Sequence, residues 1–183
     1  MGRWESTHEA LRWAALELFS ERGYDKTGTA QIAARAGVSE MTLFRHYPSK
    51  DSLLLADPFD PDMADAVRVR PEDETPLAAL AEGIRDTWRT LAPEEAAVLR
   101  GILRIAASTP TLRGGLERSS AESEGDLEDA LASRGADSAD ARVLAAAMIA
   151  GLSRALMDWA VADDPQPAAL DARVHRALDL FAA

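Results

Sequence analysis

Hydrophobic residues recur at three- and four-residue spacing along almost the whole chain, which is the period of a helix that buries one face. In the first 56 residues this pattern predicts four helices: one that ends before Gly23, then residues 29–36, residues 40–47 and one that begins at residue 50. Ser39 is suited to cap the third helix, and Pro48 to end it. Residues 57–61 break or bend the chain, so we expect domains of residues 1–56 and 57–183.

The longer remainder of the chain repeats the helical pattern. Its apolar stripes predict helices over approximately residues 77–91, 93–105, 109–131, 138–162 and 167–181. Between Leu116 and Leu127 the third of these carries only small and polar residues, so its middle should face solvent. No segment alternates apolar and polar residues in the two-residue period of a strand, and the predicted fold class is therefore all-α.

Composition excludes several classes of function. The chain has 183 residues and no cysteine, which excludes disulfides, a cysteine nucleophile and cysteine-bound metal. Its three histidines are too scattered for a zinc motif, no glycine-rich phosphate loop precedes a helix, and no Ser/His/Asp set has a local signature. We therefore expect no enzyme, no metal and no cofactor, and a protein-interaction module is the second class of function to consider.

The chain lacks the usual signals of a secreted or membrane protein. Charged residues interrupt the apolar positions near the N-terminus, unlike those of a signal peptide. The longest apolar run, residues 143–152, is ten residues long, about half of the ~20 that a spanning helix needs. We expect a soluble, cytoplasmic protein.

The net charge of −11 argues against a nucleic-acid partner until its distribution is considered. Residues 1–56 contain seven Lys or Arg and seven Asp or Glu, so this segment is neutral. The rest of the chain contains 13 Arg against 24 Asp or Glu, and both lysines lie in the first segment. A neutral first domain is thus joined to a strongly acidic second domain.

Two short helices joined by a turn form a helix-turn-helix pattern in the first domain. Ala33 allows the two helices to approach closely, and Gly37 permits the turn between them. Val38 and Leu43 are placed to pack the second helix against Ile32 of the first. Many small helical hairpins share this spacing, so by itself it leaves DNA binding as one possibility among several.

Residues 11–55 resemble the DNA-binding domain of TetR-type transcriptional repressors. The resemblance rests on two stretches, LRWAALELFSERGY and TAQIAARAGVSEMTLFRHYPSKDSLL. It implies a three-helix helix-turn-helix DNA-binding domain in residues 1–56 and a helical ligand-binding and dimerisation domain in residues 57–183. It further implies a ligand-responsive regulator, a homodimeric repressor that leaves a pseudo-palindromic double-stranded DNA operator when a small hydrophobic or acyl-CoA-like effector binds.

The resemblance also implies roles for single residues, because the second helix of the motif should enter the major groove. Arg45 is suited to form two hydrogen bonds with guanine, and Met41 and Thr42 to touch thymine methyl groups or phosphate. Thr29 and Lys50, each at the start of a helix, should hold phosphates.

Three further positions of this interface carry departures or alternatives. Phe44 belongs to it but stands where the family usually has Tyr, so a hydroxyl that could bond phosphate is missing. Glu40 either accepts a hydrogen bond from a cytosine amino group or only caps the helix while repelling phosphate. His46 either contacts phosphate or packs half-buried against its own domain.

Residues 143–152 are apolar on every side of their helix, which indicates a helix buried on two sides. One side would face its own domain and the other a second subunit, although burial inside a monomer produces the same pattern. The resemblance implies that the last two long helices of each subunit form a four-helix dimer interface. The residues expected there are Leu152, Leu156, Val174, Leu178 and Phe181.

An effector pocket between the middle helices is also implied by the resemblance. Bulky side chains near the apolar stripes are candidates for its lining, although ordinary core packing explains each of them equally well. These candidates are Phe59, Trp88, Ile102, Met148 and Trp159.

The segment DPFDPDMADAVRVRP resembles the start of the regulatory domain in a TetR subgroup associated with acyl-CoA-like ligands. The acidic second domain would repel the phosphates of coenzyme A unless arginines gather at the mouth of its pocket. The arginines in question are Arg68, Arg70, Arg100 and Arg104, and their alternative is pairing with the abundant Asp and Glu.

Overall fold

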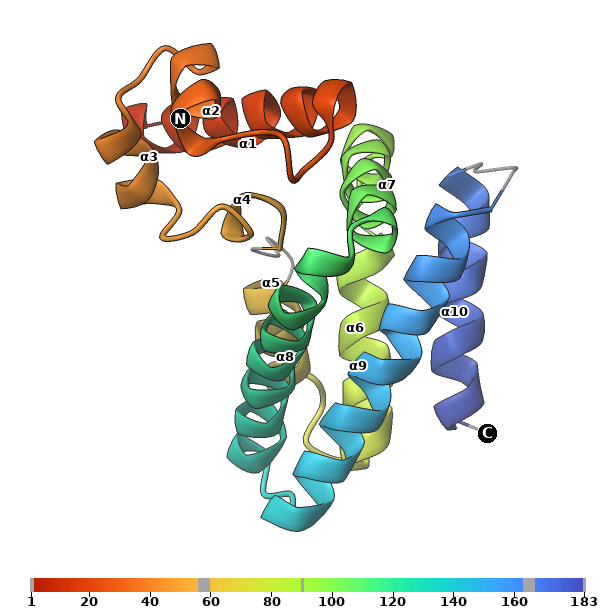
Figure 1. The fold of residues 1–183 in the computed structure, drawn as a ribbon. Coiled ribbons are helices and arrows are strands. Elements are labelled where there is room, and N and C mark those ends of the chain that lie inside the picture. The colour runs from red at the N-terminus through yellow and green to blue at the C-terminus, as the bar shows by residue number, and fades with distance from the viewer. Residues whose placement is uncertain (1, 56–59, 90, 163–166, 183) are drawn as a thin grey trace. The chain divides into compact units, whose positions relative to one another are not determined.

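The structure is a computed structural model that describes residues 2–55, 60–89, 91–162 and 167–182. Helices account for most of these residues, and no strand occurs among them, so the predicted all-α class is confirmed (Figure 1). In chain order the elements are α1 (Arg3–Arg22), α2 (Thr29–Arg35), α3 (Glu40–His46), α4 (Ser52–Leu55), α5 (Asp60–Arg68), α6 (Pro76–Arg89), α7 (Pro93–Ser108), the 3₁₀ helix η1 (Pro110–Leu112), α8 (Arg113–Ser133), α9 (Ser138–Ala160) and α10 (Pro167–Ala182).

The helices group into two compact units. The head unit comprises residues 1–56 and 101–116, and the body unit comprises residues 57–100 and 117–183. The first half of α7 therefore belongs to the body unit and its second half to the head unit. The predicted boundary after residue 56 lies outside the described residues, and the sequence pattern did not indicate that a later segment packs with the first domain.

The core of the head unit joins the apolar faces of α1–α4 to the segment around η1. Its fully buried side chains include Leu11, Ala15, Ile32, Leu43 and Leu53. In the later segment, Leu112 is 1% exposed, and the Thr111 hydroxyl donates to the Asp25 carboxylate at 2.8 Å. Gly115 approaches α4 so closely that an added Cβ would lie 2.7 Å from Cδ1 of Leu55.

In the body unit, α6 is the central helix and packs against α5, α9 and α10 (Figure 1). Gly83 permits the close approach of α5, because an added Cβ there would lie 2.8 Å from the backbone nitrogen of Val67. On the side of α10, Arg85 is only 9% exposed and donates to Asp179 at 2.9 Å. One face of α6 thus packs by close backbone contact and another by a partly buried ion pair.

The helix α5 corrects the sequence-based picture of residues 57–76, which predicted a break and no helix before residue 77. The structure has α5 from Asp60, and residues 57–59 lie outside the described part of the chain. Pro61 falls in the first turn of α5, where its missing N–H leaves no hydrogen bond unmade. Met63, Ala64 and Val67 then bury one face of the helix.

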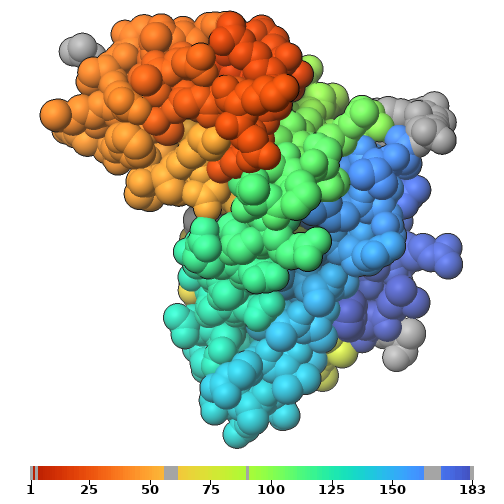
Figure 2. All heavy atoms as spheres, viewed as in Figure 1, coloured from red at the N-terminus to blue at the C-terminus, as the bar shows by residue number. Residues whose placement is uncertain are grey.

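The helix α9 is long and apolar enough, by length and composition alone, to cross a membrane. Only 33% of its most apolar window is buried, and the core helix of a soluble protein passes the same test. Figure 2 shows atoms of α9 open to the viewer along the visible face of the body unit. The described chain therefore leaves much of an apolar helix uncovered.

Candidate nucleic-acid interface

The turn between α2 and α3 sets the two helices in a helix-turn-helix. Gly37 has a φ of 71°, in the left-handed region that favours glycine, and the Val38 N–H donates to the Ala33 carbonyl at 2.9 Å. Ile32 and Leu43 are fully buried between the helices. The predicted motif is therefore confirmed, and its inward-facing residues are those that the spacing indicated.

The outer face of α3 is exposed along the whole helix. Met41 is 77% exposed and Phe44 is 46% exposed, and the two lie three positions apart on one helix face. Arg45, also exposed, has no hydrogen-bond or ion-pair partner among the described residues. α3 thus combines a buried seam at Leu43 with an apolar and cationic surface that the fold itself does not use.

Side-chain hydrogen bonds cap the start of α3 and, in one case, join it to the start of α2. Ser39 caps α3, as predicted, because its Oγ accepts from the Thr42 N–H at 3.1 Å and lies 2.9 Å from the Thr42 hydroxyl. The Thr29 hydroxyl donates to Oε1 of Glu40 at 2.5 Å. Glu40 is therefore bonded to α2, and the N-cap hydrogen bond of α3 comes from Ser39 instead; whether Glu40 accepts from cytosine or only stabilises the start of the helix stays a prediction.

His46, the last residue of α3, packs against α1. Its ring stacks on Trp4 with centroids 3.7 Å apart, and the neighbouring Tyr47 ring stacks on His8 at 4.1 Å. Nδ1 of His46 is buried and has no hydrogen-bond partner within the described chain. His46 thus packs against its own domain, as one of the two expected roles required. A phosphate contact through Nε2 of the same ring stays a prediction.

Both histidines of this cluster titrate below their ordinary range. Burial lowers the pKa of His46, and the adjacent positive charge of Arg45 lowers it further. Burial is also the main cause that lowers the pKa of His8; the charges of His46 and Arg12 act in the same direction, and Glu9 partly opposes them.

Lys50 lies in the turn before α4 and is half-buried. It donates hydrogen bonds to the backbone carbonyls of Tyr24 at 2.9 Å and Thr27 at 3.1 Å. The lysine that the resemblance assigns to phosphate thus also holds the loop between α1 and α2, and its phosphate contact stays a prediction.

The structure brings all eight predicted DNA-facing residues into the head unit, at the start of α2, along α3 and just before α4. Sequence reasoning missed the residues that support them, Trp4, His8 and Tyr24. Trp4 and His8 lie four positions apart on α1 and share one face of it, which is a signal that the sequence did contain.

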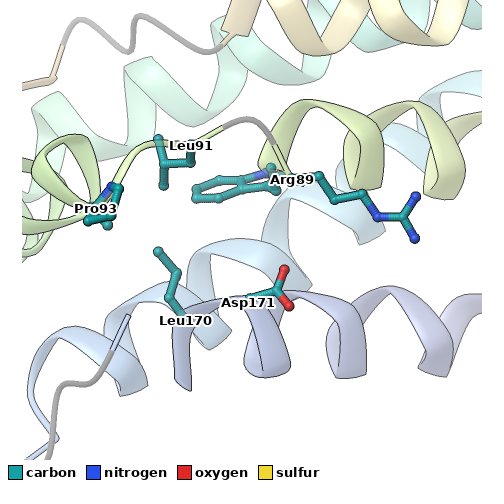
Figure 3. A pocket seen from close by; sticks show the side chains of 7 residues that line it. Arg89, Leu91, Pro93, Leu170 and Asp171 are labelled. Atoms are coloured by element: carbon teal, nitrogen blue, oxygen red, sulfur yellow. The ribbon is translucent and has the colours of Figure 1, made fainter. Parts of the chain in front are cut away.

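A cavity of about 360 Å³ opens in the body unit between the end of α6, the start of α7 and the start of α10 (Figure 3). Leu91 and Leu170 lie at one end of it, and Arg89 and Asp171 lie at the other (Figure 3). The full lining is Trp88, Arg89, Leu91, Pro93, Ala96, Leu170 and Asp171. The cavity therefore has a mixed lining, with apolar side chains at one end and two charged side chains at the other.

The predicted pocket residues do not gather at this cavity. Trp88 lines it, but Met148 and Trp159 are each 1% exposed and belong to the core of the body unit. Ile102 is buried in the head unit, and Phe59 lies outside the described residues. Met148, Trp159 and Ile102 are therefore residues of the packed cores and do not line this cavity.

The predicted dimer residues divide into two sets. Leu152, Val174 and Leu178 are at most 3% exposed in the single chain, so they pack inside the protomer and have no surface left for a partner. Leu156 and Phe181 keep some exposed surface. The large apolar side chains that α9 and α10 leave most exposed are instead Val143, at 67%, and Leu180, at 75%.

Comparison with known proteins agrees with this geometry. A family model described as bacterial regulatory proteins of the tetR family matches residues 12–56. The HTH-type transcriptional regulator TcmR of Streptomyces glaucescens is 33% identical over 135 residues, which cover 70% of this chain and 60% of TcmR. The chain thus matches less than two thirds of that relative's length.

Two solved structures show the same fold along nearly the whole chain. SmeT, the repressor of the Stenotrophomonas maltophilia multidrug efflux pump SmeDEF, has a TM-score of 0.61 and 22% identity, covering 96% of this chain and 90% of SmeT. FadR of Bacillus subtilis, in complex with stearoyl-CoA, has a TM-score of 0.57 and 22% identity, covering 94% of this chain and 96% of FadR.

The fold and the exposed α3 define an all-α helix-turn-helix regulator, in which a DNA-binding domain precedes a helical domain. More particularly, the chain belongs to the TetR family of bacterial regulatory proteins.

Proposed function

We propose that this chain is a cytoplasmic, ligand-responsive transcriptional regulator, a repressor that binds a pseudo-palindromic double-stranded DNA operator as a homodimer. The observation that carries the proposal is the outer face of α3, where Met41, Phe44 and Arg45 are exposed while Leu43 fixes the helix to the domain. An α-helix fits the major groove, and the free guanidinium of Arg45 matches the O6 and N7 acceptors of guanine. Met41 and Phe44 offer apolar contact to thymine methyl groups.

Selection of binding sites from random-sequence DNA, followed by gel-shift titration of the selected operator, tests the DNA-binding part. Arg45→Ala should weaken specific binding by ~1–3 kcal/mol and relax the preference at one base position. Arg22→Ala, which removes an exposed arginine at the end of α1, is the matched control and should bind like the wild type. Equal binding by Arg45→Ala and Arg22→Ala would contradict the placement of α3 in the groove.

The uncovered surface of α9 supports the homodimer. Val143, Ala147 and Ala150 are exposed and recur at three- and four-residue spacing, so they form an apolar stripe on the outer face of the helix. A second copy of this stripe would remove it from water, and two-fold pairing would present two α3 helices to successive major grooves, ~34–36 Å apart.

The cavity beside α10 supports a compact effector. Its volume of about 360 Å³ lies near the lower end of the ~300–1,000 Å³ usual for small-molecule sites, which favours a small ligand over a long-chain acyl-CoA. Three of the four arginines considered for coenzyme A phosphates are engaged within the chain. Their partners are Asp65 for Arg68, Glu74 and Asp86 for Arg70, and the carbonyls of Ala160 and Ala162 for Arg100.

A gel-shift titration with neutral hydrophobic compounds beside long-chain acyl-CoA tests the effector. Release of the operator by the neutral compounds alone would remove the acyl-CoA alternative. By reciprocity, operator DNA must weaken effector binding by the same factor. Ala96→Leu, which fills the cavity from α7, should abolish the response, whereas Ala97→Leu on the exposed side should retain it. A response that survives Ala96→Leu would place the effector elsewhere.

A further inference from the structure

The first residue of the recognition helix α3 is a carboxylate, on the face that the proposed function turns toward DNA. Glu40 is exposed and forms no ion pair among the described residues. Duplex DNA carries one negative charge per ~1.7 Å of helix axis, so an unpaired carboxylate at its surface is repelled. The common reason for an acidic residue at this point of a helix is capping, but Ser39 already supplies that bond to the Thr42 N–H.

The carboxylate of Glu40 is held in place by a hydroxyl group from the preceding helix. Thr29 is the first residue of α2, and its Oγ donates to Oε1 of Glu40 at 2.5 Å. A threonine hydroxyl has one proton, so in this arrangement Thr29 has none to donate to a phosphate. Only one oxygen of Glu40 is used by this bond, and the remaining acceptor sites of the carboxylate are left for another donor.

We propose that Glu40, oriented by Thr29, reads cytosine in the major groove by accepting a hydrogen bond from the exocyclic amino group of that base. An ionised carboxylate can only accept, and the major-groove edges of guanine and thymine present acceptors that repel it. Adenine offers an amino donor but places its N7 acceptor beside that donor, whereas the edge of cytosine offers the donor alone. Thr29 is then a positioning residue and not a phosphate contact. The proposal rests on the proposed function, because it assigns one base within that interface.

Binding-site selection with the full-length wild type and with Glu40 variants tests the assignment. The wild type should require C·G at one position of each half-site. Glu40→Ala should lose about tenfold in affinity for that operator and the preference at that position, with the other positions unchanged. Glu40→Gln should shift the preference there from cytosine to adenine, because an amide pairs with both N6 and N7. Glu21→Gln, which removes a carboxylate on α1, should leave the selected sequence as it is.

Variants of Thr29 separate positioning from phosphate binding. Thr29→Val keeps the shape of the side chain but removes the hydroxyl, and it should relax the same base position as Glu40→Ala. Thr29→Ser should restore the preference. If Thr29→Val weakens all sequences equally, the hydroxyl contacts phosphate and the positioning role is overturned.

The outcomes distinguish this inference from the proposed function. A wild type that selects no sequence overturns the proposed function and this inference with it. A wild type that selects an operator, with a Glu40→Ala variant of unchanged preference, overturns this inference alone. Tighter binding of all sequences by Glu40→Ala would show that the carboxylate only repels phosphate, and would likewise overturn it.

Discussion

The ammonium group of Lys50 lies over the ring of Tyr24, 4.0 Å from the ring centroid, and donates to the backbone carbonyl of the same residue at 2.9 Å. A second bond to the carbonyl of Thr27 leaves one of its three protons for another acceptor. One side chain therefore closes the loop between α1 and α2 and keeps a positive charge beside the proposed DNA surface.

Replacing Lys50 should reduce both stability and DNA binding. Lys50→Met keeps most of the aliphatic chain but loses the charge, so the free energy of unfolding should fall by about 1–3 kcal/mol as two charged hydrogen bonds and the ring contact disappear. Binding to all DNA sequences should weaken, with a salt dependence lower by about one ion. Urea denaturation and binding at several salt concentrations measure these effects. Lys26→Met, at the other lysine of the chain, which is exposed, is the control. Equal stability of the two variants would contradict the structural role of Lys50.

Two glycines in different helices of the body unit should respond to alanine in opposite directions. At Gly83 an added Cβ would lie within 3 Å of the Val67 backbone, so Gly83→Ala should push α5 away from α6 and lower stability by about 1–3 kcal/mol. At Gly125, in α8, no atom lies within 4 Å of the added Cβ, and Gly125→Ala should raise stability by about 0.4–1 kcal/mol. Thermal unfolding measures the stability of both variants. A stabilising Gly83→Ala would contradict the close approach of α5 to α6.

The half-buried histidines His8 and His46 make the head unit sensitive to acid. The folded chain holds the pKa values of His8 and His46 below the ordinary 6.5, so the unfolded chain takes up protons first as the pH falls. Their contribution to stability is therefore complete above about pH 6.5 and is lost as the pH falls through 6.5 toward the lower folded-state pKa values.

Urea denaturation at pH 7.5, 6.5 and 5.5 measures this loss. The double variant His8→Gln/His46→Gln should show a weaker pH dependence than the wild type in that interval. An unchanged dependence in the double variant would show that other groups cause the acid sensitivity.

Charge on the outer face of α9 should separate the dimer without unfolding the protomer. Val143→Glu places an unpaired carboxylate in the proposed seam, which is costly once water is excluded, and should yield a helical monomer. Sedimentation at micromolar concentration measures the change. Val69→Glu, at a still more exposed valine after α5, should remain dimeric. Leu178→Glu is unsuitable because Leu178 is fully buried and its variant should unfold. A wild-type monomer would contradict the proposal.

Short-range chemistry was enough to predict the helix-turn-helix. Gly37, Ser39 and Pro48 mark a turn, a cap and a helix end through their own backbone preferences, and the structure has α3 between the last two. The helix α5 was missed because Asp60 and Pro61 are turn-forming residues as well as residues of a helix's first turn. Such residues by themselves do not decide between a turn and the start of a helix.

Contacts between distant positions were not predictable in the same way. Tyr47 donates to the carbonyl of His8 across 39 positions of the chain, and nothing local to either residue indicates the other. In α9 apolar residues occur on every side, so spacing does not show which side faces the protomer. Leu152 was therefore expected at the dimer interface but packs inside, while Val143 remains exposed.

Residues 101–116 pack with residues 1–56 in the head unit, which limits how DNA-binding domains can be exchanged between such regulators. A chimera that joins residues 1–56 to the effector-binding region of a relative would set a foreign segment against α4, without the bond from Thr111 to Asp25 and the close approach at Gly115. The transferable DNA-reading module is discontinuous, and its border crosses the chain at three places. Recombination within this lineage is therefore expected to preserve both segments together, and engineered hybrids should transplant them as a pair.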